Sequence, residues 1–329
     1  MQAADETPAE RRSIGPVSDL SIAARTVVER CLAVQPGENV LVVCDPTRLD
    51  IAEALHDAAL TAGGDSVIQI LPPKPERGTE PPPTVAAAFA ACDVYLAPSE
   101  PSLSHTRARK AASEKGARGA TLPGVERDML ARLMSADFAE MASRSQRVAD
   151  LLTASDTARF TCANGSDFAF DLSGRTAIPD AGALTERGAF GNLPCGEGFI
   201  APTGGSGTLV AKTIGHFGLS EELVTVTAED GRLTGATGAL GEQLVAHLDR
   251  YGPDGRHLAE LGVGTNERAQ LTGNLLEDEK ILGTVHVAFG ASAGIGGTVN
   301  VPVHEDCVVL EPTLHIGDTL VVDAGRFVL

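Results

Sequence analysis

The sequence predicts an α/β domain followed by an α+β domain. As far as about residue 150, strand and helix patterns alternate, which is typical of a parallel sheet covered by helices on both faces. Beyond that point strand patterns dominate, and the turns between them favour hairpins. The chain has 329 residues, of which 43 % are apolar, so each of two domains can form its own core. We predict a disordered tail over 1–17 and domains over 18–150 and 151–329.

The first domain is expected to be Rossmann-like or flavodoxin-like, because its segments follow one another at the spacing of a doubly wound sheet. Its first strand, 39–44, is a continuous apolar run, as in strands that are buried on both faces. Further strands are predicted over 66–71, 93–97 and 119–122. Helices are predicted over 22–34, 49–62, 84–91, 104–115 and 127–134. Neither GxGxxG nor GxxxxGK[ST] follows the first strand, so we expect no nucleotide site.

The second domain is expected to consist mainly of antiparallel strands. Two helices are predicted within this half of the chain or at its start, over 141–152 and 239–251. Strands are predicted over 158–163, 167–172 and 222–228, and a β-meander over 299–329. Turn sequences such as Asn164-Gly165 and Asp230-Gly231 separate hairpin arms.

The overall charge is strongly acidic. Lys and Arg number 26 against 44 Asp and Glu, a formal net charge of −18 that opposes binding to nucleic acid or anionic membranes. Six cysteines without a CxxC pair fit reduced thiols. No apolar run approaches the roughly 18 residues that a spanning helix needs, and the N-terminal residues lack the apolar part of a secretory signal. We expect a cytoplasmic protein without nucleic-acid or membrane partners.

The triplet His304-Glu305-Asp306 indicates a metal site. Its imidazole and second carboxylate stand two residues apart, so on a strand they share a face. Two further candidates, His286 and Glu260, stand in apolar strand-like runs. A buried carboxylate is costly unless it is paired, protonated or bound to metal. These residues together predict a divalent-metal site.

Other polar residues leave two readings open. Glu197, between Gly196 and Gly198, is either a metal ligand or an exposed turn glutamate. His216 and His257 could enter the site, but their segments favour a place around it or on the surface. His247 falls in a predicted helix and is expected to face solvent, and His105 is assigned only to the first domain.

The order and surroundings of these residues resemble the aminopeptidase T (thermophilic leucyl aminopeptidase) family of two-metal exopeptidases. The resemblance is densest over 192–202 and 259–312. It implies an N-terminal α/β domain, a C-terminal metal domain and a homodimer. It also implies two divalent ions per chain, Zn, Co or Mn, bridged by Glu260. The implied ligands are Glu197, Glu260, His286, His304 and Asp306. The tyrosine that the family carries seven residues after His286 is Ala293 here.

Three functions follow as hypotheses. The first is a metal-dependent hydrolase that cleaves an amide bond of a short peptide or small amino-terminal substrate with metal-activated water. Glu260 or Glu197 would be its general base. The alternative is a mononuclear non-haem Fe(II) ring-cleaving enzyme that resembles 2,5-dihydroxypyridine dioxygenase, with His286, His304 and Asp306 as ligands. The third is a metal-binding homologue without catalytic activity, which the missing tyrosine favours.

Overall fold

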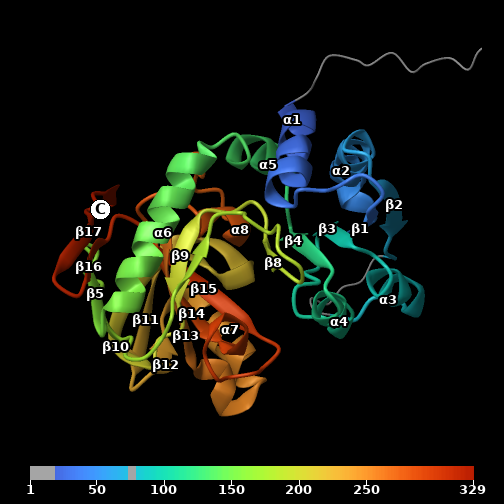
Figure 1. Ribbon diagram of the computed structural model, residues 1–329. Helices are drawn as coiled ribbons and strands as arrows, with labels where there is room; N and C mark the ends of the chain where they lie inside the picture. The colour runs from blue at the N-terminus through green and yellow to red at the C-terminus, as the bar shows by residue number, and fades with distance from the viewer. Residues whose placement is uncertain (1–18, 73–78) are drawn as a thin grey trace, which may run out of the picture.

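Two sheets organise the chain (Figure 1). The computed structural model describes residues 19–72 and 79–329, and the tail predicted over 1–17 lies outside the described residues. One sheet has five parallel strands and the other has thirteen strands, which confirms the predicted α/β plus α+β class. The domain boundary predicted near residue 150 falls inside a helix, α6 (Phe138–Ala154), that packs on the larger sheet.

The parallel sheet has the strand order β2-β1-β3-β4-β8, and its first four strands follow the flavodoxin-like order. These strands are β1 (Asn39–Cys44), β2 (Asp65–Ile70), β3 (Val94–Ser99), β4 (Arg118–Pro123) and β8 (Phe190–Asn192). The last strand is contributed by the chain beyond residue 150 and pairs with Gly119–Thr121 of β4.

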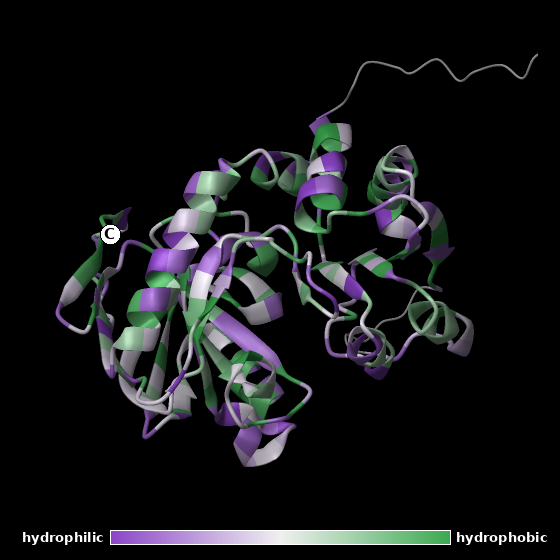
Figure 2. Cartoon of the chain, viewed as in Figure 1, coloured by the Kyte–Doolittle hydropathy of each residue, from purple (hydrophilic) through white to green (hydrophobic). Residues whose placement is uncertain are grey.

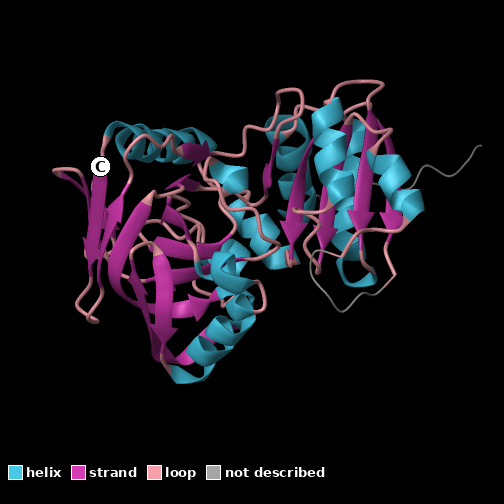
Figure 3. Cartoon of the chain, turned by 90° about the horizontal axis from the view of Figure 1, so that it is seen from below, coloured by secondary structure: helices cyan, strands magenta, loops and turns pink. Residues whose placement is uncertain are grey.

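Helices cover both faces of this sheet, as Figure 3 shows from below. They are α1 (Asp19–Arg25), continued by the π-helical turn η1 (Thr26–Cys31), α2 (Leu49–Thr61), α3 (Pro83–Phe89), α4 (Arg107–Lys115) and α5 (Arg127–Leu133). Successive residues of β1 point to opposite faces. Val40 and Val42 therefore join the core under α1, α2 and α5, whereas Leu41 and Val43 join the core under α3 and α4.

Helix α4 begins at Arg107, three residues later than predicted. The side chain of Thr106 accepts a hydrogen bond from the backbone N–H of Arg109, so Thr106 is the N-cap of the helix. Ser104 and His105 consequently lie in the loop that follows β3, at the carboxyl edge of the parallel sheet.

The larger sheet is curled and carries two helices, α6 and α7 (Gly238–Asp249), on its apolar core (Figure 1). Its strands are β5 (Thr157–Thr161), β6 (Asp167–Asp171), β7 (Ile178–Asp180), β9 (Glu197–Ile200), β10 (Gly204–Ile214), β11 (Gly218–Glu229), β12 (Arg232–Ala236), β13 (Leu258–Gly264), β14 (Val285–Gly290), β15 (His304–Val309), β16 (Thr313–Ile316), β17 (Thr319–Asp323) and β18 (Arg326–Phe327). Shorter elements connect them: η3 (Gly215–Phe217), η4 (Gly252–Arg256), α8 (Leu275–Asp278) and η5 (Ala293–Ile295).

The helices α6 and α7 are amphipathic. Val148 and Leu152 of α6 and Leu244 and Leu248 of α7 are fully buried in one apolar cluster with the sheet. Figure 2 shows polar and apolar residues alternating along α6, as expected of a helix with one face on a core. Among the described residues, none of the helices combines the length and apolar character that a membrane crossing requires.

Candidate metal centre and cleft

Four adjacent strands, in the order β15-β14-β13-β9, carry the five predicted ligands. Glu260 of β13 pairs with Ala288 of β14, which in turn pairs with Asp306 of β15. The two carboxylates therefore lie in one row of the sheet, separated by the small side chain of Ala288. His286 and His304 are each two residues away from this row and project from the same face.

A glycine on the neighbouring strand leaves room for the imidazole of His286. Gly262 is the strand partner of His286, and a Cβ atom at this position would lie 1.9 Å from His286 Nε2. The imidazole of His286 therefore lies against the backbone of β13 at a position that carries no side chain.

The ligand atoms form two groups that share Glu260. In the first, His286 Nε2 lies 3.1 Å from Glu197 Oε2 and 3.4 Å from Glu260 Oε1. In the second, His304 Nε2 lies 3.3 Å from Glu260 Oε2 and 3.6 Å from Asp306 Oδ2. Within each group the ligand atoms lie within 4.8 Å of one another. Atoms that bind one ion at about 2.0–2.2 Å are separated by roughly 3 Å or more, so this spacing fits metal coordination.

The orientation of the donors also fits a bound cation. His304 Nδ1 lies 2.7 Å from the carbonyl oxygen of Ala291, so Nδ1 carries the proton and Nε2 is free to bind metal. Glu197 Oε2 is buried, forms no well-aligned hydrogen bond within 19–72 and 79–329, and lies 3.1 Å from His286 Nε2. A cation held by these two atoms would satisfy the carboxylate oxygen.

The carboxylates and imidazoles of the site shift one another's pKa values. Burial opposes ionisation of Glu260, but hydrogen bonds from His286 and His304 outweigh it and hold the pKa of Glu260 below its usual range. Burial lowers the pKa of both imidazoles, but the facing carboxylates raise it by more. The pKa of each imidazole therefore lies well above its ordinary value. The two imidazoles therefore bind protons in this site. Binding of a cation to the same groups would release those protons.

A buried lysine lies next to the centre. Lys280 Nζ forms an ion pair with Glu197 and lies 2.9 Å from Glu279 Oε1 and 3.9 Å from Asp180 Oδ2. Burial raises the pKa of both Asp180 and Glu279 to about 7. The Lys280 ammonium therefore offsets part of the negative charge beside the centre.

A cleft of about 400 Å³ opens onto His304 and Asp306. Residues of the parallel-sheet half, including Ser104, His105 and Asn192, line one wall. The other wall includes His216, the loop 272–276 and Glu279. The centre is thus accessible on the side of His304 and Asp306, whereas His286 is fully buried.

His105 is a cleft residue that the sequence analysis missed. Its loop is fixed from below by Arg109, whose Nε and Nη2 donate to the carbonyl oxygen of Ser104 at 2.9 and 2.6 Å. The Arg109 guanidinium lies 3.7 Å from the centre of the Phe190 ring. The side chain of His105 is exposed to solvent; the surrounding protein, and then the positive charge of His304, lower its pKa, so its ring is neutral at pH 7. The signal available was its place just after a parallel strand, where α/β proteins bind ligands.

Asn192 presents an oriented amide to the cleft. Its Oδ1 accepts hydrogen bonds from Thr121 Oγ1 at 2.7 Å and from Ser104 Oγ at 3.3 Å. Because the oxygen is occupied, the Nδ2 group is left to donate to a ligand.

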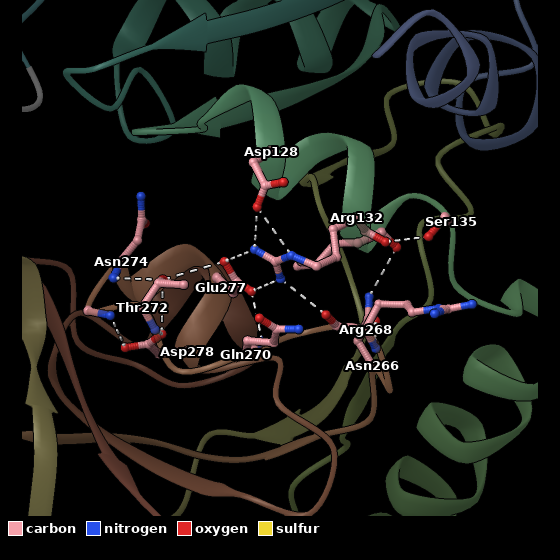
Figure 4. A network of polar contacts seen from close by, with 12 residues as sticks. Asp128, Arg132, Ser135, Asn266, Arg268, Gln270, Thr272, Asn274, Glu277 and Asp278 are labelled. Carbon is pink, nitrogen blue, oxygen red and sulfur yellow. Dashed lines mark hydrogen bonds and ion pairs between the residues drawn. The ribbon is translucent and has the colours of Figure 1, made fainter. Parts of the chain in front are cut away.

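The loop that forms the far wall is held by buried acids (Figure 4). Arg132 of α5 pairs with both carboxylate oxygens of Glu277, which is fully buried. Asp278 accepts from the backbone N–H groups of Thr272 and Gly273 at 2.8 and 2.9 Å. The run 277–279, which resembles an ordinary solvated turn in sequence, is therefore internal and shapes the cleft.

Of the other three candidate histidines, one lines the cleft and two do not. His216 lines the cleft, whereas His257 is not among the residues of this lining. His247, expected to face solvent, is half-buried, with Nε2 3.4 Å from Glu305 Oε1. Ala293 stands in η5, directly after the loop that accepts the His304 hydrogen bond.

Comparison with known proteins points to one family. The family described as 2,5-dihydroxypyridine 5,6-dioxygenase matches residues 19–329. The solved structure of 2,5-dihydroxypyridine dioxygenase from Pseudomonas putida KT2440 aligns over 95 % of this chain and 98 % of its own, with a TM-score of 0.79 and 22 % identity. Wild-type AmpT from Thermus thermophilus aligns over 94 % of this chain and 99 % of its own, with a TM-score of 0.69 and 18 % identity. No curated protein sequence matches.

These findings correct the predicted activity. The main hypothesis of an aminopeptidase-like metallohydrolase is wrong, because the family that matches nearly the whole chain is a dioxygenase family. The resemblance to aminopeptidase T holds for the fold, which the AmpT structure shares. Both solved structures align with more than nine tenths of this chain, so the shared fold alone does not separate hydrolysis from oxygenation.

Proposed function

The chain belongs to the 2,5-dihydroxypyridine 5,6-dioxygenase family, and we propose that it is a non-haem Fe(II) enzyme that cleaves the ring of a small hydroxylated pyridine. The observation that carries the proposal is the position of His304 and Asp306. Both line the cleft, and the ligand atoms of both face Glu260. This proposal is the alternative that the sequence left open.

The residues that would hold the iron are His286, His304 and Asp306, a two-histidine-one-carboxylate set. His304 and Asp306 lie in one group with Glu260, and His286 belongs to the neighbouring group that shares Glu260. Glu260 would complete the centre, because its two oxygens face the two imidazoles. We assign Glu197 a supporting part, because its Oε1 is paired with Lys280 and only its Oε2 faces His286. An Fe(II) ion at this site would supply open coordination positions for dioxygen.

The cleft suits a small planar substrate with several oxygen and nitrogen atoms. Its volume of about 400 Å³ lies at the small end of the range of ligand pockets. Asn192 Nδ2 would donate to a ring oxygen, and the neutral His105 ring would accept or donate a hydrogen bond according to its tautomer. These residues would orient the ring above His304 and Asp306 and exclude part of the water.

We also propose that the chain acts in the cytoplasm as a homodimer. The six cysteines are free in the structure, which suits a reducing compartment. The proposed partners are a small-molecule substrate and a second copy of the chain.

The test is oxygen uptake by protein that has been loaded anaerobically with Fe(II) and mixed with 2,5-dihydroxypyridine. We expect about one O₂ consumed per ring lost, because a dioxygenase places both oxygen atoms in its product. Leucine p-nitroanilide with Zn(II), Mn(II) or Co(II) tests for peptidase activity and should remain intact. Dihydroxypyridine that survives the iron-loaded protein would overturn the proposal.

Two variants separate the metal centre from the rest of the molecule. His304→Ala should lose both bound iron and oxygen uptake. His315→Ala changes an exposed histidine on β16 and should keep both. Iron measured in the same samples shows whether lost activity reflects a lost ion.

A further inference from the structure

A second histidine–carboxylate cluster forms part of the cleft wall and has no role in the centre proposed above. His216 Nδ1 lies 2.7 Å from Glu305 Oε1, and the backbone N–H of His216 donates to Glu305 Oε2 at 3.0 Å. Glu305 stands between His304 and Asp306 on β15 and therefore points to the opposite face of the strand. The Glu305 carboxylate thus forms hydrogen bonds with both the backbone and the ring of His216.

The neighbouring residues hold this hydrogen-bonded pair in place. Gly215 has a φ of +47°, and a Cβ atom there would lie 2.2 Å from Glu305 Oε2. Only a residue without a side chain leaves room for the carboxylate at this place. The rings of Phe217 and His247 pack against His216, with centroids 4.1 and 5.0 Å away. The imidazole is therefore held in one orientation.

The distances favour a hydrogen-bonded pair over a second metal site. His216, His247 and Glu305 include the donor types of a metal triad. Two ligands of one ion at about 2.0–2.2 Å are separated by roughly 2.9 Å or more. The 2.7 Å between His216 Nδ1 and Glu305 is shorter than this limit, whereas the corresponding separations at the proposed iron site are 3.1–3.6 Å.

The pairing determines which nitrogen can act. Nδ1 donates to Glu305, so Nε2 is the nitrogen with a free lone pair. His216 lines the cleft and its side chain is 26 % exposed. No protein group in the described ranges forms a hydrogen bond with Nε2. A carboxylate that fixes the tautomer of a histidine in this way also stabilises the imidazolium that forms when the ring accepts a proton.

We propose that His216 is a catalytic residue whose Nε2 binds a ring hydroxyl of the substrate and removes its proton, and that Glu305 is the residue that positions it. The O–H bond breaks, an Nε2–H bond forms, and the products are the ring oxyanion and an imidazolium paired with Glu305. The proton returns to the product or to solvent at the end of the cycle. This inference rests on the proposed function, because it requires a hydroxylated aromatic substrate.

The test uses His216→Asn, because an asparagine amide can still donate to Glu305 from the place of Nδ1 but has nothing at the place of Nε2. Glu305→Gln removes the charge that positions the ring. His315→Asn is the control, since His315 is an exposed histidine on β16 that is not among the cleft-lining residues. Bound iron is measured for every variant.

Two readouts are compared. One is kcat for oxygen uptake with 2,5-dihydroxypyridine. The other is the ultraviolet spectrum of the same compound on anaerobic binding, at a pH at which the free compound is un-ionised. Wild-type protein should shift the spectrum to that of the oxyanion. We expect His216→Asn to lose the shift and about 10²–10³-fold in kcat with iron retained, as for loss of a general base. Glu305→Gln should fall in between, and His315→Asn should stay within about threefold of wild type.

Other outcomes overturn the inference in distinguishable ways. If wild-type protein turns over and His216→Asn retains both kcat and the shift, His216 is only structural and the proposed function stands. If His216→Asn loses iron, His216 is a ligand. If wild-type protein neither binds nor consumes the compound, the proposed function fails and this inference fails with it.

Discussion

At the scale of single residues, the proposed metal centre depends on the small residues beside the proposed ligands as much as on those ligands. The strand partner of His286 is Gly262, and that of Glu260 is Ala288. Larger side chains at these positions would fill the space into which the imidazole and carboxylates converge. The ligand set therefore requires small residues on its neighbouring strands, which a motif of ligands does not state.

Gly262→Ala should consequently disable the site. The added methyl would lie 1.9 Å from His286 Nε2, so the imidazole must move away from Glu197 and Glu260. We expect at least tenfold weaker metal binding, in line with displacement of a ligand or its support. Gly235→Ala on β12 is the control, because its Cβ would meet only Thr227 Oγ1 at 3.6 Å. Equal metal affinity of the two variants, measured by titration, would contradict this account.

At the scale of elements, the ion pair between Arg132 of α5 and Glu277 of α8 connects the two halves of the chain (Figure 4). Glu277 is fully buried, so removal of the guanidinium leaves a buried charge without its partner. We expect Arg132→Met to lower the free energy of unfolding by roughly 3 kcal/mol, the lower end of the range for broken buried pairs. The midpoint of urea unfolding measures it.

The double variant Arg132→Met/Glu277→Gln is the control for this pair. It removes the charge but keeps an acceptor for the backbone N–H of Gln270, which donates to Glu277 at 2.8 Å. Most of the lost stability should return. A single variant that costs less than about 1 kcal/mol would show that the pair contributes little.

A second pair makes the start of β1 sensitive to pH. Arg118 of β4 donates to both carboxylate oxygens of Glu38 at 2.7 and 2.8 Å. The hydrogen bond from Arg118 holds the pKa of Glu38 below its usual range. A lowered folded-state pKa means that the contribution is complete above the unfolded pKa of about 4.3 and is lost as the pH falls through the folded value.

Glu38→Gln should therefore cost about 1 kcal/mol at pH 7, a value reduced for partial exposure, and progressively less below about pH 4. Urea unfolding of both proteins at several pH values measures the difference. Glu242→Gln on the exposed face of α7 should change the free energy by less than about 0.5 kcal/mol throughout. A cost for Glu38→Gln that does not change with pH would exclude the ion pair as its source.

The elements that could be predicted are those with strong local patterns. The apolar run 39–44, the helix that ends before Gly63-Gly64 and the helix of 239–251 all occur close to the expected places. The Gly-rich segment 190–214 forms β8, β9 and β10, which were not predicted. Its strands are defined by distant partners, as in the pairing of Glu197 with Gly264, and not by an alternation of their own residues.

The residues of the site also divide into those that the sequence could predict and those that it could not. Residue chemistry and family resemblance suggested the five ligands that the sheet brings together. The cleft residues His105 and His216 could not be assigned in this way, because both lie in loops whose positions depend on distant residues. Arg109 and Thr106 define the first loop, and Glu305 defines the second.

At the scale of the whole molecule, the cleft forms where the carboxyl edge of the parallel sheet meets the ligand-bearing face of the larger sheet. Ser104 follows β3, Gly124 follows β4 and Asn192 ends β8, and all three line the cleft. This is the edge at which open α/β sheets bind ligands. The proposed metal ligands, in contrast, come from the larger sheet alone. The parallel sheet would thus orient the substrate, and the larger sheet would hold the ion.

Metal binding should accordingly stabilise the larger sheet in particular. Any ion that binds only the folded state adds about 2.7 kcal/mol at a free concentration of 100 times its Kd. For units of this size, that corresponds to roughly 5–10 °C in Tm. Calorimetry with Fe(II) under anaerobic conditions, compared with chelator, should show this rise, and His304→Ala should lose it while His315→Ala keeps it. If two transitions resolve, only one should move, because all the proposed ligands belong to one sheet. Identical scans with metal and with chelator would show that the carboxylate–histidine cluster does not bind the ion in the folded protein.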